Sequence, residues 1–221
     1  MLEWLNNNSG ALSAIASFCT LGVWLFYAQL LYLGFARQRR PRILINRGRS
    51  KSPDGMCLIS NMSSEAIFVT NVMGVLHTSK NTYNCDLTDY TRSDDSGEGR
   101  GEQHATRQGP LASGDYHQVC SFREIIDHVT DGNALDIDRN TLTLEGEKLR
   151  MLEIRLIAIY GSENRPLGAY RSFMLEKSEL DPNEEDNDCL IVPTSFDTQR
   201  LSRRWHQKRI RRWLEALPSS R

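Results

Sequence analysis

The chain has 221 residues with 27 basic and 28 acidic side chains, so its formal net charge is −1. After one membrane segment, this length leaves room for a single domain of ordinary size. The five cysteines are odd in number and none has CxxC-type spacing, which argues against a structural zinc site.

A long uncharged segment lies near the N-terminus. No charged residue occurs between Trp4 and Ala36, and the apolar stretch Leu12–Phe35 has 24 residues. As a helix it would be roughly 36 Å long, which exceeds a hydrocarbon core of about 30 Å. A signal peptide would begin with a positive charge and have a shorter apolar stretch, and a buried core helix rarely lacks every charge over this length. We therefore predict a transmembrane helix over residues 11–36, preceded by a short tail of residues 1–10 outside the cytoplasm.

Positive charges follow this segment and set its expected orientation. Residues 37–51 contain seven basic side chains and no acidic one: Arg37, Arg39, Arg40, Arg42, Arg47, Arg49 and Lys51. Basic residues next to a membrane helix stay on the cytoplasmic side. We expect a single-pass protein of the inner membrane with its N-terminus outside and its C-terminal domain in the cytoplasm. The charges expected to lie at the membrane surface are Arg37, Arg39, Arg40 and Arg42.

Small side chains share one face of the predicted membrane helix. Ser13, Ala16, Ser17 and Thr20 recur at a spacing of three or four residues. Small residues at this spacing let two helices approach closely and form hydrogen bonds across the contact. We expect this face to contact another helix, either from a second copy of the chain or from a different protein.

The soluble part has the pattern of a mainly-β domain. Short apolar runs are separated by turn residues over residues 42–193. The expected strands are Arg42–Asn46, Gly55–Ser60, Ala66–His77, Tyr83–Thr88, Asp115–Cys120, Leu149–Tyr160, Leu167–Glu176 and Cys189–Val192. About eight strands predict a β-sandwich, for which an immunoglobulin-like arrangement is one form, although no Trp occurs between Trp24 and Trp205.

One short helix interrupts the strands. Ser121 and Glu124 form a Ser-x-x-Glu capping box, and apolar residues follow at helical spacing. We expect this helix to end at Asp131-Gly132, with Gly132 in the left-handed C′ position, and Gly74 in an expected strand to mark a bulge. The polar stretches Thr91–Gln108 and Ser178–Asp188 are predicted to be solvated linkers.

The C-terminal segment is strongly basic. Residues 200–221 carry eight positive charges against Glu215 alone, while residues 52–199 have a net charge of −14. The simplest interpretation places both basic ends against the inner leaflet; alternatively, the basic tail docks on an acidic body. We predict a basic helix over residues 197–218, capped by Asp197. Its candidate binding residues, for a protein partner, lipid or nucleic acid, are Arg203, Arg204, Trp205, Lys208, Arg209, Arg211, Arg212 and Trp213.

No pattern of catalytic chemistry stands out. Motifs for nucleophilic, phosphate-binding or metal-dependent chemistry are absent from the sequence. The densest carboxylate group, Asp86, Asp89, Asp94 and Asp95, lacks nearby ligands at a metal-binding spacing. We therefore expect no enzymatic activity, no cofactor, no metal and no small-molecule substrate.

These features favour a membrane-anchored scaffold that recruits a cytosolic protein to the inner membrane. One alternative is an oligomerising membrane effector, whose helix disturbs the bilayer when the cytosolic domain is triggered. Another is a membrane tether for nucleic acid through the basic tail. The plan resembles that of uncharacterised bacterial inner-membrane proteins, including some accessory components of antiviral systems; the resemblance is one of architecture and carries over no residue.

Overall fold

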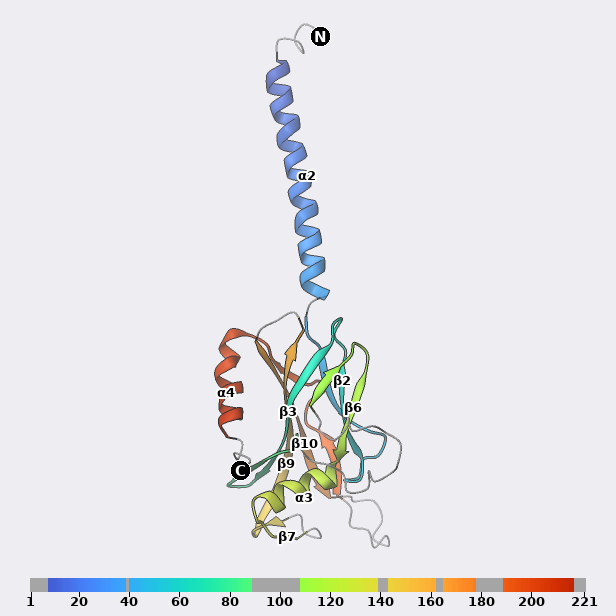
Figure 1. Ribbon diagram of the computed structural model, residues 1–221, viewed down its shortest axis with the longest axis vertical. Coiled ribbons are helices and arrows are strands. Elements are labelled where there is room, and N and C mark those ends of the chain that lie inside the picture. The colour runs from blue at the N-terminus through green and yellow to red at the C-terminus, as the bar shows by residue number, and fades with distance from the viewer. Residues whose placement is uncertain are drawn as a thin grey trace. The chain divides into compact units, whose positions relative to one another are not determined.

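The computed structural model describes residues 8–38, 40–88, 108–138, 143–161, 165–177 and 189–216, without the side chains of residues 37 and 38. The chain forms two compact units, Met1–Arg40 and Pro41–Arg221. Figure 1 gives the labels of the helices and strands of both units. The predicted linkers lie outside the described residues, apart from Gln108.

The described part of the first unit is one long helix, α2 (Ser9–Gln38), with the residues next to its ends. Its residues Ser9–Ala36 are long and apolar enough to cross a membrane and are not buried against any other part of the structure. Large apolar side chains such as Phe18, Trp24 and Leu31 are exposed along it. The expected helix is thus present, and it begins two residues before the predicted residue 11.

The second unit is mainly β. Every strand predicted from the apolar runs is present to within about two residues at most ends, and four short strands are additional in the described residues. The strands are β1 (Ile43–Arg47), β2 (Met56–Asn61), β3 (Ile67–Thr78), β4 (Thr82–Asp86), β5 (Gly109–Leu111), β6 (Tyr116–Ser121), β7 (Ile137–Asp138), β8 (Thr143–Leu144), β9 (Glu147–Tyr160), β10 (Pro166–Lys177), β11 (Cys189–Pro193) and β12 (Gln199–Leu201).

Antiparallel pairing assembles these strands into two main sheets. The smaller sheet has the order β1-β2-β6. The larger follows the order β11-β10-β9-β3-β4. Strand β5 pairs with β3 along the same edge as β4, and strand β12 pairs with β10 along the same edge as β11. The long strands β3, β9 and β10 form its centre, and β7 and β8 extend from the start of β9.

Both sheets contribute to one hydrophobic core. Residues of the smaller sheet, such as Ile45 and Ile59, belong to the same buried cluster as Leu152, Ile154 and Leu156 of β9. Because successive residues of a strand point to opposite faces, the even-numbered residues of β9 from Leu152 to Tyr160 line this core and Ile157 lies on the other face. Two sheets that share one core are compatible with the predicted sandwich, but the sandwich and its immunoglobulin-like form stay predictions.

A buried arginine connects the two sheets. Arg171 of β10 is 6 % exposed and donates from Nη1 to the carbonyl oxygen of Ile45 at 2.8 Å and to Oδ1 of Asn46 at 2.6 Å. Its Nη2 donates to the carbonyl oxygens of Ser195 at 3.0 Å and Phe196 at 3.2 Å. One guanidinium thus satisfies backbone acceptors of β1 and of the segment before β12, which explains a charge inside the core.

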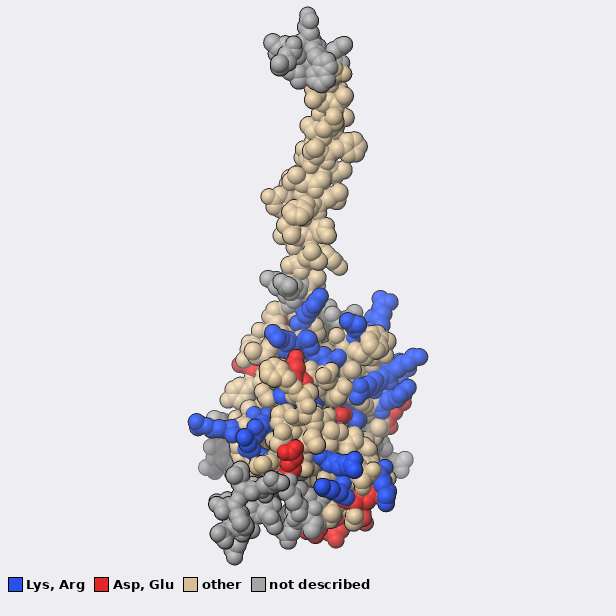
Figure 2. Space-filling view, turned by 180° about the vertical axis from the view of Figure 1, so that it is seen from behind, with Lys and Arg blue, Asp and Glu red and all other residues tan. Residues whose placement is uncertain are grey.

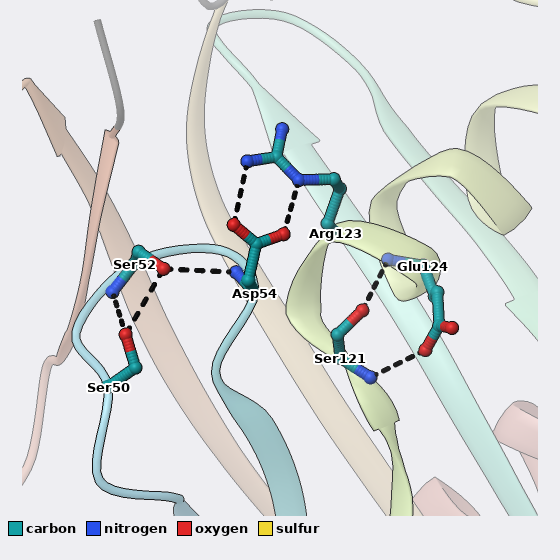
Figure 3. Close-up of polar contacts among 6 residues, drawn as sticks. All are labelled: Ser50, Ser52, Asp54, Ser121, Arg123 and Glu124. Carbon is teal, nitrogen blue, oxygen red and sulfur yellow. Dashed lines mark hydrogen bonds and ion pairs between the residues drawn. The ribbon is translucent and has the colours of Figure 1, made fainter. Parts of the chain in front are cut away.

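Helix α3 (Phe122–Gly132) lies at one end of the domain (Figure 1). Its predicted capping box is confirmed: Ser121 Oγ accepts from the backbone nitrogen of Glu124 at 3.2 Å, and Glu124 accepts from the Ser121 nitrogen at 2.8 Å (Figure 3). Beside it, Arg123 donates two hydrogen bonds to the Asp54 carboxylate, at 2.6 and 3.1 Å. The two capping-box bonds satisfy backbone N–H groups at the helix start that would otherwise lack partners.

Both glycine predictions for this region were wrong. Gly74 does not mark a bulge, since the register of β3 with β9 shifts near Thr70 and at His77/Thr78 instead. A Cβ at Gly74 would lie 2.9 Å from Ile125 of α3, so this glycine permits close packing of helix on strand. Gly132 ends the helix without a positive φ, and the left-handed residue is Ala134, with φ 52°.

The C-terminal segment differs from the predicted helix over residues 197–218. Residues Gln199–Leu201 form strand β12, a 3-10 turn η2 (Arg204–His206) follows, and helix α4 spans only Gln207–Glu215. The edge of β10 explains the difference, because residues Gly168–Tyr170 there offer hydrogen-bonding groups that β12 satisfies. Asp197 accordingly does not cap a helix; its carboxylate accepts from the backbone nitrogen of Thr198 at 2.8 Å.

Candidate basic surface of the C-terminal segment

Strand β12 brings the basic tail back to the start of the domain. Its residue Arg200 donates from Nη1 to the carbonyl oxygen of Pro41 at 2.7 Å. Arg42, next in the chain after Pro41, is exposed, as are Arg200 and Arg203. Two basic segments that are 159 residues apart in sequence therefore lie next to each other.

Helix α4 packs on the face of the larger sheet that points away from the main core. Its buried residues Ile210 and Trp213 form a second cluster with Leu201, Met73 and Ile157. Gly168 of β10 makes this contact close, since a Cβ there would lie 3.1 to 3.2 Å from atoms of Ile210, Leu201 and Trp213. The helix therefore has a fixed orientation, with its apolar side already covered by its own domain.

Two arginines surround the Trp213 ring. The guanidinium of Arg155 lies 5.0 Å from the ring centroid and that of Arg209 lies 5.5 Å from it, within the range of cation–π attraction. Arg209 also lies 4.5 Å from the centroid of Tyr170, and Arg155 forms an ion pair with Glu153 at 2.5 Å. The structure thus assigns Trp213 and Arg209 of the predicted binding tail to the attachment of α4.

The other predicted tail residues point to solvent. Lys208, Arg211 and Arg212 are exposed on the side of α4 opposite Ile210 and Trp213. Side chains of Lys and Arg project along the edge of the domain where α4 lies (Figure 2). We call Lys208, Arg211 and Arg212 the α4 cation row.

A second exposed group precedes α4 in the chain. Arg203, Arg204 and Trp205 are exposed, and the Trp205 side chain retains 69 % of its accessible surface. The Trp205 ring lies 4.2 Å from the His206 ring and 6.0 Å from the Arg203 guanidinium. An indole at the surface among arginines is typical of a binding interface.

The predicted contact face of α2 is accessible along the helix. Ser13, Ala16, Ser17 and Thr20 are exposed, while Ser17 Oγ donates to the Ser13 carbonyl oxygen at 2.9 Å and Thr20 Oγ1 to that of Ala16 at 2.8 Å. These hydroxyls keep acceptor capacity for a second helix. Among the predicted surface charges, Arg40 and Arg42 are exposed, Arg39 lies outside the described residues, and only the backbone of Arg37 is described.

The described residues contain no group of three or more His, Cys, Asp or Glu side chains that could hold a metal ion. Of the carboxylate group noted in the sequence, Asp86 lies in β4, and Asp89, Asp94 and Asp95 lie outside the described residues. Burial lowers the pKa of His77 on β3, with Glu153 opposing and Arg155 adding to the effect. Its Nδ1 lies 3.2 Å from the Thr82 hydroxyl, so this histidine is part of the packing between β3 and β4.

Sequence reasoning identified the exposed basic residues but not the residues that fix them. Gly168, Arg155 and Tyr170 carry no signal of their own, because they meet the tail only after β10 and β9 have paired. In β10, Tyr170 alternates with the buried Ala169 and therefore points away from the main core.

Comparison with known proteins gave no match among family models, curated protein sequences or solved structures. The function proposed below therefore depends on the residues of this chain alone.

Proposed function

We propose that this protein is a membrane-anchored binding module that holds an acidic cytosolic protein at the inner membrane. In this proposal helix α2 is the anchor, and the basic residues after it support a cytoplasmic location for the β-domain, which we interpret as a sandwich. The α4 cation row is the binding surface for the partner.

The packing of α4 is the observation that carries this proposal. A helix that lies in a membrane interface buries its apolar face among lipids. In α4 that face is already buried, with Ile210 only 1 % and Trp213 only 4 % exposed. Its free face carries Lys208, Arg211 and Arg212, held by a helix that needs no further ordering on binding, which lowers the entropic cost of association.

A protein partner fits this surface better than a nucleic acid does. Residues 52–199 have a net charge of −14, and a long polyanion would be repelled by this body beyond α4. An acidic segment of a protein needs to contact only the α4 cation row. Arginine is common at the energetic centre of protein interfaces, where it forms two hydrogen bonds with a carboxylate.

Charge reversal on the full chain tests the proposal. We expect a stoichiometric protein partner when the wild-type chain is purified from its native membranes in mild detergent and its native mass is measured. The triple variant Lys208→Glu, Arg211→Glu, Arg212→Glu should lose that partner. The control variant Lys80→Glu, Lys148→Glu, Arg150→Glu changes the charge equally at exposed positions away from α4 and should retain it. The binding of the identified partner should also weaken steeply as salt is raised.

The other outcomes contradict the proposal in different ways. If the partner stays bound to the α4 triple variant, the α4 cation row is not the binding surface. Co-purified material that nuclease digests would instead favour the nucleic-acid tether. A homo-oligomer without any other protein, which is lost when Ser13 and Ser17 are replaced by Leu, would favour the membrane effector. A chain that alkaline carbonate extracts from native membranes would show that α2 is not an anchor.

A further inference from the structure

One end of the β-domain is connected directly to the segment that follows α2. The domain begins at Pro41, whose carbonyl oxygen accepts from Arg200 at 2.7 Å. The carbonyl oxygen of the next residue, Arg42, accepts from the backbone nitrogen of Met62 at 2.7 Å. We call the end of the domain where these four residues lie the Pro41 end.

The register of the strands places other turns at the same end. Ile67, the first residue of β3, pairs with Leu111 and with Tyr160, so the turns before β3 and after β5 and β9 meet there. Ser60 pairs with Tyr116, which adds the start of β6. Gln207 of α4 donates to the carbonyl oxygen of Pro166 at 2.9 Å, so residues 202–206 belong to this end as well.

Positive charge dominates the exposed residues of the Pro41 end. In the described turns there, the carboxylates are those of Glu65 and Asp115. The exposed arginines outnumber them: Arg42, Arg165, Arg200, Arg203 and Arg204. The α3 end of the domain, by contrast, carries many acidic side chains, which appear at the lower edge of Figure 2.

Large apolar side chains are exposed among these arginines. Met62 is 54 %, Tyr116 is 60 % and Trp205 is 69 % exposed. Trp and Tyr prefer the boundary between lipid and water, and arginine binds phosphate groups with two parallel hydrogen bonds. Exposed indole and phenol rings among arginines therefore match the chemistry of an anionic bilayer surface.

We infer that the Pro41 end of the β-domain lies on anionic lipid headgroups, with its arginines on phosphates and Trp205 and Met62 at the interface. This inference depends on the anchorage by α2 proposed above. Only residues 39 and 40 separate Gln38, the last residue of α2, from Pro41, and three Cα steps span at most about 11 Å. An anchored domain thus has its Pro41 end within reach of the headgroups. The binding of its arginines to lipid phosphates then fixes the orientation of the domain.

The surface is separate from the α4 cation row. Trp205 and the arginines before it precede α4, whereas Lys208, Arg211 and Arg212 are presented along its outer side. An orientation held by lipid at the Pro41 end leaves the α4 cation row free for a protein.

Photocrosslinking of the full chain in lipid nanodiscs tests this orientation. Met62→p-benzoylphenylalanine places a photoreactive group at the Pro41 end, and Lys148→p-benzoylphenylalanine places it near the start of β9, at the opposite end. Both chains are incorporated into discs of phosphatidylcholine alone or with phosphatidylglycerol, and lipid adducts are measured by intact mass. We expect adducts from position 62 in the anionic discs and little from position 148.

Charge reversal separates binding from mere proximity. With the group at position 62, the variant Arg165→Glu, Arg203→Glu, Arg204→Glu should lower the adduct yield in anionic discs about tenfold or more, because several arginines near the surface act together. The control variant Lys80→Glu, Lys148→Glu, Arg150→Glu should leave the yield unchanged.

The results that would overturn the inference are distinct from those that refute the anchor. Equal yields from positions 62 and 148, or equal yields in neutral and anionic discs, would mean that this end has no preferred contact with anionic lipid. If the chain stays in the discs at high salt but yields no adduct, the inferred contact of the Pro41 end with lipid is refuted and the anchor is not. If the chain leaves the discs at high salt, the anchor is wrong, and this inference fails with it.

Discussion

Gly168→Ala should partly release helix α4 from the β-domain. The new methyl group would lie 3.1 Å from Cγ1 of Ile210 and 3.2 Å from atoms of Leu201 and Trp213. Each neighbour would have to move by a few tenths of an ångström, and Leu201 is held by the pairing of β12 with β10. The least constrained response is for α4 to move away from the sheet.

The expected loss follows from overpacking. A methyl group inserted into a close contact costs about 1–3 kcal/mol. Gly168 stays in the folded strand β10 whether or not α4 is docked, so this cost falls on the docking of α4. A loss of about 1–2 kcal/mol, in the lower part of this range, raises the undocked fraction of α4 roughly five- to thirtyfold.

Limited trypsin digestion of the full chain in detergent measures this fraction. Cleavage after Lys208, Arg209, Arg211 or Arg212 requires α4 to open, so its rate follows the undocked population when opening is fast. Gly48→Ala is the matched control, since its Cβ would lie 3.5 to 3.7 Å from atoms of Met56, an ordinary contact. If Gly168→Ala and Gly48→Ala are cleaved within α4 at the same rate, the proposed packing of α4 is refuted.

Three further predictions concern the domain itself, each measured by urea unfolding of the full chain in detergent. Arg171→Leu should lower the free energy of unfolding by about 3 kcal/mol, because buried acceptors of β1 and of residues 195–196 lose a charged donor; an unchanged value would contradict its linking role. Ser121→Ala should cost about 1 kcal/mol through loss of the α3 cap, and a value near zero would mean that the capping box adds nothing. Burial lowers the pKa of His77 below its unfolded value of 6.5, so the folded domain binds this proton less readily than the unfolded chain. Stability should therefore decline as the pH falls below 6.5 towards the folded-state pKa, and His77→Gln should remove that part of the decline; identical pH profiles would exclude His77 as its source.

The long elements could be predicted from sequence because their apolar periods reflect burial directly. Alternation in β3, β9 and β10 and the capping box of α3 identified them within a few residues. Strands β5, β7, β8 and β12 have two or three residues each, too few to show any period. Residues 199–201 were predicted to be helical, but they pair with the free edge of β10 instead. This tertiary effect is not contained in the local sequence.

The candidate surface was predictable in composition but not in arrangement. The basic residues of the tail were evident, yet Trp213 was assigned to binding and lies buried instead. Its environment comes from Met73, Ile157 and Arg155, which are far away in sequence. Such a cluster forms only when the strands pair, so no local pattern could separate the residues that attach α4 from those that face outwards.

The division of the apolar residues into two clusters has a consequence for how the protein is made. Among the residues that the structure describes, Ile191 is the last one in the main core, whereas Leu201, Ile210 and Trp213 belong to the second cluster. During synthesis these residues leave the ribosome after those of the main core, so the main core can form before the basic surface exists. A truncated product ending at Thr198 would keep every described residue of the main core. It would lack the α4 cation row and three of the five arginines of the Pro41 end, and it would retain Arg42 and Arg165. Under the proposed function, loss of the residues after Thr198 would thus leave a folded domain on its anchor without the surface that carries the partner.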